Sequence, residues 1–123
     1  MITHPKPEEL TEAVGRWIEE IRPQLDPRNQ FLARVAANAL AAVTRELTLG
    51  EEAKAAAVQR LEPILGHGGT YEGLNWELCE KLRAGELDAA TPGLLAALRG
   101  NILDQLAIDQ PTYKHEGSPR PSA

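Results

Sequence analysis

Residues 27–49 read PRNQFLARVAANALAAVTRELTL, and this stretch decides the fold. Asp26 followed by Pro27 signals a helix start, because an aspartate caps free N–H groups and proline fits the first turn. We expect this helix to run to Leu49, roughly 34 Å at ~1.5 Å per residue, and to stop at Gly50. Apolar residues on more than one of its sides predict a central helix. They are Phe31, Leu32, Val35, Ala36, Ala39, Leu40, Val43 and Leu47.

Shorter amphipathic segments flank this helix on both sides in the sequence. Helices are expected from 7 to about 22, from 51 to 65, from 71 to 84 and from 91 to 110, bounded by proline and glycine. The first of them has a one-sided apolar stripe, so we expect that stripe to lie on a core. Its members are Leu10, Val14, Trp17, Ile18 and Ile21.

These segments predict an all-α protein, a single-domain helical bundle of four to five helices with a long central helix. No run alternates apolar and polar residues in the way of a β-strand. We expect residues 1–6 to be a flexible N-terminus, residues 7–111 to form the bundle and residues 112–123 to be a flexible C-terminal tail.

Composition narrows the class of protein. Apolar residues make up 42% of the chain and charged residues 25%, as in ordinary globular domains. The net charge of −5 argues against nucleic acid as a partner, because phosphate binding needs clustered Lys and Arg. One cysteine, Cys79, and no long apolar run or signal-like N-terminus predict a cytoplasmic protein without membrane contact.

Motifs for catalysis are not found in the sequence. His67 sits among glycines, but no strand precedes it and no Lys-Ser/Thr pair follows, so a loop that ends a helix is expected. His4 and His115 have no His or Cys at metal-binding spacing, and we expect no metal site and no cofactor. Cys79 is expected to be a small buried hydrophobic residue. We therefore predict that the chain has no catalytic residues and is not an enzyme.

A polar lane on the long helix is a first candidate contact site. Arg34, Asn38 and Arg45 fall at i, i+4 and i+11, on one side of the helix. Two interpretations stay open for this lane. It is the solvent-facing side of the helix, or it meets a carboxylate, a phosphate or a partner protein.

A second candidate is the segment Asn75-Trp76-Glu77. Trp76 lies off the stripe that Leu74 and Leu78 form, so it belongs either to a second buried face or to a contact with a partner. Glu77 and Lys81, at i and i+4, are expected to form a surface ion pair of little energetic weight.

Three stretches together resemble a known family. They are FLARVAANAL at 31–40, LNWELC at 74–79 running on to LRAGELD at 82–88, and DQLAI at 104–108 before Pro111. The chain resembles a family of small bacterial proteins of unassigned function, typically encoded beside an aminoglycoside-phosphotransferase-like kinase and an acyl-CoA dehydrogenase.

One member of that family is similar to the small accessory subunit needed by the kinase of levulinic acid breakdown, which phosphorylates the hydroxyl of a 4-hydroxyacyl-CoA. The resemblance therefore implies a non-catalytic partner of such a kinase in acyl-CoA metabolism. It makes Arg34, Asn38, Asn75 and Glu77 candidate contact or polar-network residues.

Two other classes of function remain as alternatives. A self-contained binder of a small acyl or CoA-like ligand would need a pocket lined by the alanines of the long helix. A homo-oligomeric structural module would need a large exposed apolar patch, and so would the kinase partner.

Overall fold

A computed structural model of the chain describes residues 3–114. The elements in chain order are α1 (Pro7–Ile21), the short 3-10 helix η1 (Arg22–Gln24), α2 (Pro27–Leu65), α3 (Tyr71–Arg83) and α4 (Leu94–Asp109). The described residues include no β-strand. The all-α class with a long helix is confirmed. The predictions for residues 1–2 and for the tail from His115 onward fall outside the described residues.

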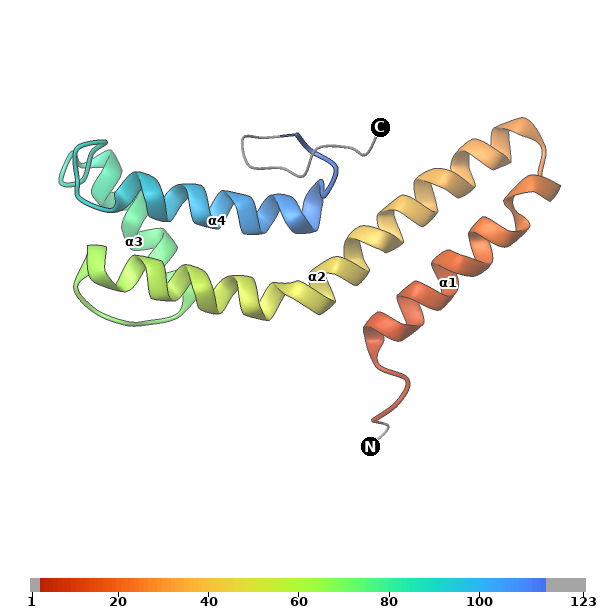
Figure 1. The fold of residues 1–123 in the computed structure, drawn as a ribbon, viewed down its shortest axis with the longest axis horizontal. Helices are drawn as coiled ribbons and strands as arrows, with labels where there is room; N and C mark the ends of the chain where they lie inside the picture. Colours follow the sequence, from red (N-terminus) through yellow and green to blue (C-terminus); the bar gives the residue numbers. More distant parts are fainter. Residues whose placement is uncertain (1–2, 115–123) are drawn as a thin grey trace.

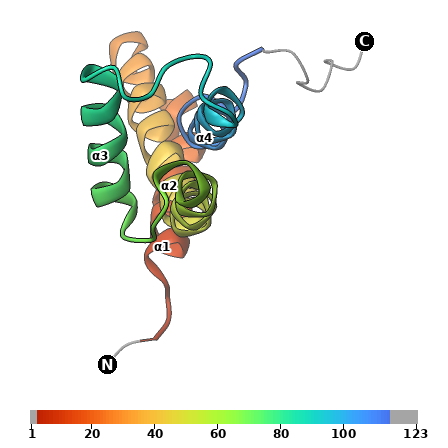
Figure 2. The same cartoon turned by 90° about the vertical axis from the view of Figure 1, so that its left-hand side faces the viewer.

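The long helix α2 organises the whole molecule. Figure 1 shows α1 beside the N-terminal half of α2 and α4 beside its C-terminal half, both antiparallel to α2, and α2 changes direction near its middle. Figure 2 shows α3 and α4 on different sides of α2. Among the described elements, α1 packs only on α2 and η1. The fold is therefore a two-helix hairpin joined through α2 to a three-helix unit.

The long helix does not end where the sequence predicts. Two helices were expected, with a break at Gly50, but α2 runs unbroken from Pro27 to Leu65. A glycine inside a helix costs only about 1 kcal/mol relative to alanine, and the residues around Gly50 are strong helix formers. Gly50 is buried beside Ala57, in a crevice that Asn101 and Ile108 of α4 also line. The atoms nearest to a Cβ added at Gly50 belong to the Glu46 side chain of the same helix, at 3.1 Å. The helix therefore accommodates this glycine instead of ending there.

Helix α2 ends at Leu65 and is followed by Gly66, which caps it with a φ of 84°. Only glycine adopts this left-handed conformation at little cost, which makes it the usual residue just past a helix end. Pro63 lies inside the last turn of α2, which continues two residues beyond it to the predicted end at Leu65. The expected loop at 67–70 and the helix from Tyr71 are confirmed, with Thr70 Oγ1 accepting a hydrogen bond from Gly73 N at 3.1 Å.

The densest core lies at the C-terminal end of α2. Leu61 is fully buried, and it packs with other leucines from α2, α3 and α4. Fully burying a leucine contributes about 1.5–3 kcal/mol, so this cluster carries much of the stability. Its buried members are Leu61, Leu65, Leu74, Leu78 and Leu94.

Most of the apolar stripe of α1 does not lie on a core, contrary to the prediction, and its other two members, Ile18 and Ile21, are half-buried. Leu10, Val14 and Trp17 are 51%, 48% and 58% exposed, and no residue of α1 is buried. The helix instead faces α2 through smaller groups. Thr11 Oγ1 lies 2.6 Å from Thr44 Oγ1, and a Cβ on Gly15 would lie 3.9 Å from the Cβ of Leu40. Small residues bring the two helices together and turn the large apolar side chains outward.

Among the described residues, no helix is long and apolar enough to cross a membrane.

Candidate functional site

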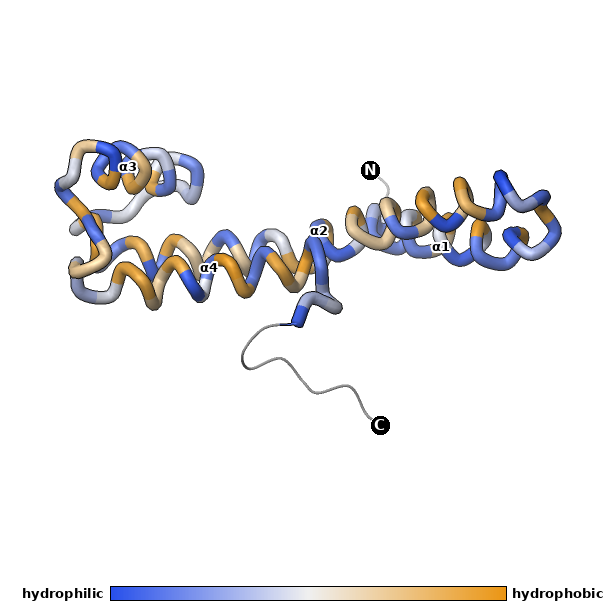
Figure 3. Tube along the Cα trace, turned by 90° about the horizontal axis from the view of Figure 1, so that it is seen from above, coloured by the Kyte–Doolittle hydropathy of each residue, from blue (hydrophilic) through white to orange (hydrophobic). Residues whose placement is uncertain are grey.

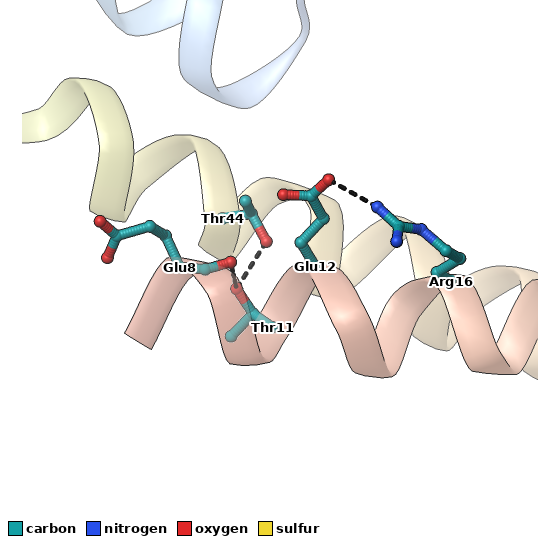
Figure 4. Close-up of polar contacts among 5 residues, drawn as sticks. All are labelled: Glu8, Thr11, Glu12, Arg16 and Thr44. Atoms are coloured by element: carbon teal, nitrogen blue, oxygen red, sulfur yellow. Dashed lines mark hydrogen bonds and ion pairs between the residues drawn. The ribbon is translucent and has the colours of Figure 1, made fainter. Parts of the chain in front are cut away.

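A polar groove runs between α1 and α2 on one side of the hairpin. It has a volume of about 570 Å³ and contains the Glu12–Arg16 ion pair, in which Arg16 Nη2 donates to Glu12 Oε1 at 3.0 Å. Figure 4 shows this pair next to the Thr11–Thr44 contact at the edge of α1. The groove is open, and its lining combines polar and charged residues with the small residues Gly15, Ala37 and Ala41. Its lining is Thr11, Glu12, Gly15, Arg16, Glu19, Ala37, Asn38, Ala41, Thr44 and Arg45.

The structure divides the predicted polar lane into two parts. Arg34 and Asn38 are exposed, so for them the solvent-facing interpretation fits. Arg45 is half-buried, and its Nε donates a hydrogen bond of 2.6 Å to the carbonyl oxygen of Ile108. That carbonyl belongs to the last turn of α4, where C=O groups lack partners inside the helix and a cation is favoured. Arg45 thus ties α4 to the middle of α2.

On α3, Trp76 is exposed. Its side chain is 66% exposed, so it is not part of a second buried face, and its Nε1 donates to Glu80 Oε1 at 3.1 Å. Asn75 is also exposed. For Trp76 the contact with a partner remains as a prediction.

Glu77 pairs with a different residue from the one expected. Its Oε2 lies 2.7 Å from His67 Nε2, while His67 Nδ1 lies 2.9 Å from the carbonyl oxygen of Gly68. These two acceptors, the carbonyl of Gly68 first and the carboxylate of Glu77 second, raise the pKa of His67 above its usual value. The histidine therefore fastens the loop after α2 to the middle of α3.

Cys79 was expected to be buried, but it is exposed. It follows Leu78, which is buried, and successive helix residues point about 100° apart. Leu74 and Leu78 form the side of α3 that packs on the core, so Cys79 faces solvent. The two predicted contact sites, on α2 and on α3, are not brought together, because the lane is on the hairpin and α3 packs at the opposite end of α2.

The outer side of α4 is a surface that the sequence interpretation missed. Leu95 and Ile102 are 60% and 58% exposed, although Leu94, Ala97 and Ile108 on the inner side are buried. A groove of about 780 Å³ follows this outer side. We call its apolar lining the α4 face; it consists of Leu95, Leu98, Ile102, Leu103, Leu106 and Tyr113. The sequence does carry a signal for this surface, because the apolar residues of α4 are distributed around the whole helix. One neighbouring helix can cover only one side of them.

Polar contacts hold α4 against α2 on the inner side. Arg60 Nη1 donates to Asp104 Oδ2 at 2.8 Å and to Asn101 Oδ1 at 3.1 Å. Arg60 also lies over Gly100, where an added Cβ would come within 2.6 Å of the guanidinium nitrogen Nε. The guanidinium of Arg60 occupies the space that a side chain at position 100 would fill. This contact therefore helps to pack α4 against α2.

No group of three or more His, Cys, Asp and Glu residues in the range 3–114 is placed to hold a metal ion. The described surfaces include an open polar groove on the hairpin, the exposed indole of Trp76 on α3 and the α4 face.

The model of one family, described as a domain of unknown function (DUF6285), matches residues 23–113. The matched range holds α2, α3 and α4 and begins after α1. Neither the curated proteins nor the solved structures contain a match to this chain. Since the family model covers well over half of the sequence, the chain belongs to the DUF6285 family.

Proposed function

We propose that the chain is a non-catalytic accessory subunit that docks on an aminoglycoside-phosphotransferase-like kinase acting on a hydroxyacyl-CoA. The kinase and its substrate class come from the family resemblance of the three motifs. The observation that supports a docking role is the α4 face, which leaves Leu95 and Ile102 more than half exposed on a well-packed domain.

Several features of the α4 face suit a protein partner. Its apolar side chains line a continuous groove, and an amphipathic helix or loop of a partner can bury apolar residues in such a groove. Arg99 and Asp109 also line it and supply charges of both signs at its rim. The whole face lies in the part of the chain that the family model matches.

Trp76 offers a second anchor for the partner. Tryptophan is enriched among residues that dominate binding energy, because a large rigid ring buries much area at little entropic cost. The indole of Trp76 is exposed, and Glu80 holds its N–H group in place. We place Asn75 and Glu77 beside it as weaker contact residues.

The test is co-expression of the chain with an aminoglycoside-phosphotransferase-like kinase from the same organism. We expect the two proteins to co-purify, and we expect phosphorylation of a 4-hydroxyacyl-CoA by the kinase to require the chain. Ile102→Glu places a charge in the α4 face and is expected to weaken binding at least tenfold. Val43→Glu, on the exposed side of the hairpin, is the matched control and is expected to leave kinase binding unchanged.

Two results would refute this assignment. One is a kinase that is equally active without the chain. The other is unchanged binding by Ile102→Glu while circular dichroism shows native helix content.

A second candidate function has one observation in its favour. Ala37 and Ala41 line the polar groove with Arg16 and Arg45, so small side chains and cations meet in one open space of about 570 Å³. An acyl-CoA could place its phosphates near those cations. A thermal-shift titration with acyl-CoA esters tests this: a ligand that stabilises the wild type but not Arg16→Ala supports it, and no shift with any ester refutes it.

A further inference from the structure

One side of the hairpin, formed by α1 and residues 27–49 of α2, carries a continuous set of large apolar side chains that no described element covers. All of them are between 43% and 58% exposed. We call this set the hairpin face. Its members are Leu10, Val14 and Trp17 of α1 and Leu32, Val43 and Leu47 of α2.

Charged residues lie on other sides of the two helices. Glu12, Arg16 and Glu19 of α1 line the polar groove together with Arg45 of α2. By helical spacing, these positions are well over 100° around their helices from Val14 and Val43, respectively. Figure 3 shows the result: hydrophobic residues follow one edge of the hairpin and hydrophilic residues the other. The six side chains of the hairpin face are therefore separated from the charges of the polar groove, although the exposed Arg28 and Glu46 lie about 60° around α2 from Val43.

The spacing of the apolar residues is that of a helical bundle. On α1 they stand at 10, 14, 17 and 21, and on α2 at 32, 36, 39 and 43, which is a step of four, three and four in both helices. This pattern is typical of knobs-into-holes packing between nearly parallel or antiparallel helices. Ala36 and Ala39, both exposed, leave room in the middle of the face for larger side chains from opposite.

We propose that the hairpin face binds the same face of a second copy of this chain, so that two hairpins form a four-helix bundle. A flat, two-helix surface is self-complementary under a two-fold axis, which is the usual symmetry of dimers. At the exposed fractions above, the six side chains present on the order of 600 Å². That area is about three quarters of the roughly 800 Å² per partner of a standard stable interface, and the exposed Ala36 and Ala39 in the middle of the face add to it.

The sequence after the described residues does not supply an apolar cover for the hairpin face. Residues 115–123 read HEGSPRPSA and contain no large apolar side chain. The α4 face is a separate surface, because α4 packs beside the other half of α2. The inference is independent of the proposed kinase partner, because it uses a different surface.

The mass of the chain in solution, measured by sedimentation equilibrium or light scattering, tests the dimer. We expect the wild type to approach twice the 13.4 kDa chain mass at micromolar concentration. Val14→Glu on α1 and Val43→Glu on α2 are each expected to raise the dimer dissociation constant at least tenfold. The matched control is Ile102→Glu, an exposed apolar residue of α4, and it is expected to remain dimeric.

A readout that needs no destabilising variant is the fluorescence of Trp17 in a Trp76→Phe chain. Its emission is expected to shift to the blue as the concentration rises, because the indole leaves water on dimerisation. A wild type that stays monomeric up to about 100 µM, well above typical dimer constants, would overturn the proposal. So would loss of the dimer in Ile102→Glu but not in Val14→Glu. If Val14→Glu abolishes kinase binding in a monomeric protein, the hairpin face belongs to the kinase instead.

Discussion

The two halves of α2 are both rich in apolar residues, but the structure buries them to very different degrees. In the C-terminal half, Leu61 is 0% and Leu65 8% exposed. In the N-terminal half, Val43 and Leu47 are 46% and 43% exposed. The C-terminal half has α3 and α4 as neighbours on different sides, whereas the N-terminal half has α1 and the short η1 along it and meets α4 only near its end, through Arg45.

This difference shows that apolar content and burial are separate properties of a helix. A single neighbouring helix covers one side of α2, and small residues such as Ala33 and Ala37 occupy that side of the hairpin. The larger residues are left for a partner. The chain thus combines a three-helix unit that buries its own core with a hairpin whose apolar side is available to bind a second protein surface.

The largest effect is expected from the core of the three-helix unit. Leu61→Ala removes a fully buried side chain and leaves a cavity, which costs about 2–5 kcal/mol of unfolding free energy. Val43→Ala in the hairpin is the control, measured by urea denaturation at a concentration that keeps the chain monomeric. We expect it to cost under about 1 kcal/mol, because the side chain is half exposed. Equal losses in the two variants would abolish the contrast between the halves.

A smaller effect is expected where the two regions meet. Arg45→Ala removes the hydrogen bond to the carbonyl of Ile108 and is expected to cost about 1.5–3 kcal/mol, the range for bonds with a charged partner. Arg34→Ala, at an exposed position on the same helix, is expected to stay within about 0.5 kcal/mol of the wild type. Chemical denaturation measures both, and identical stabilities of the two variants would show that Arg45 does not join α4 to α2.

Within the hairpin, Thr11→Val tests the polar contact between α1 and α2. The loss is expected to be about 0.5–1.5 kcal/mol, toward the lower end, since Thr44 Oγ1 keeps its other hydrogen bond to Leu40 O. Thr48→Val, whose hydroxyl bonds only to Thr44 O on its own helix, serves as the control. A loss in Thr48→Val as large as that in Thr11→Val would mean that the contact between the helices contributes nothing.

The smallest effect is a dependence of stability on pH through His67. The carbonyl of Gly68 and the carboxylate of Glu77 raise its pKa above 6.5 in the folded chain. Protonation therefore favours the folded state, so the stabilisation is fully present below about pH 6.5 and is lost as the pH rises through the raised pKa.

Melting temperatures of the wild type and His67→Asn between about pH 6 and pH 8 measure this contribution. The advantage of the wild type is expected to shrink as the pH rises. An NMR titration that places the pKa of His67 at or below 6.5 would contradict the assignment.

Local signals in the sequence predict the helices well, because caps and stops act over a few residues. Asp26 and Pro27 mark the start of α2, and Gly66 marks its end. Gly50 misleads because glycine is the usual residue just past a helix end, yet inside a helix it costs only about 1 kcal/mol relative to alanine.

Which way an apolar stripe faces is not a local property. The spacing of Leu10, Val14 and Trp17 is the same for a stripe that meets the chain's own core and for one that meets another molecule. The same holds for Arg45, whose partner is a backbone carbonyl of α4 and so leaves no mark in the sequence pattern. Trp76, off the buried stripe of α3, is the candidate that the sequence located and the structure left exposed.

Hydrogen–deuterium exchange at several protein concentrations tests most directly the claim that the C-terminal unit is stable by itself and the hairpin is completed from outside. We predict strong protection of residues 57–65 at every concentration. Protection of α1 is predicted to be weak in dilute solution and to rise with concentration. Protection of α1 as strong as that of residues 57–65, and independent of concentration, would contradict the account.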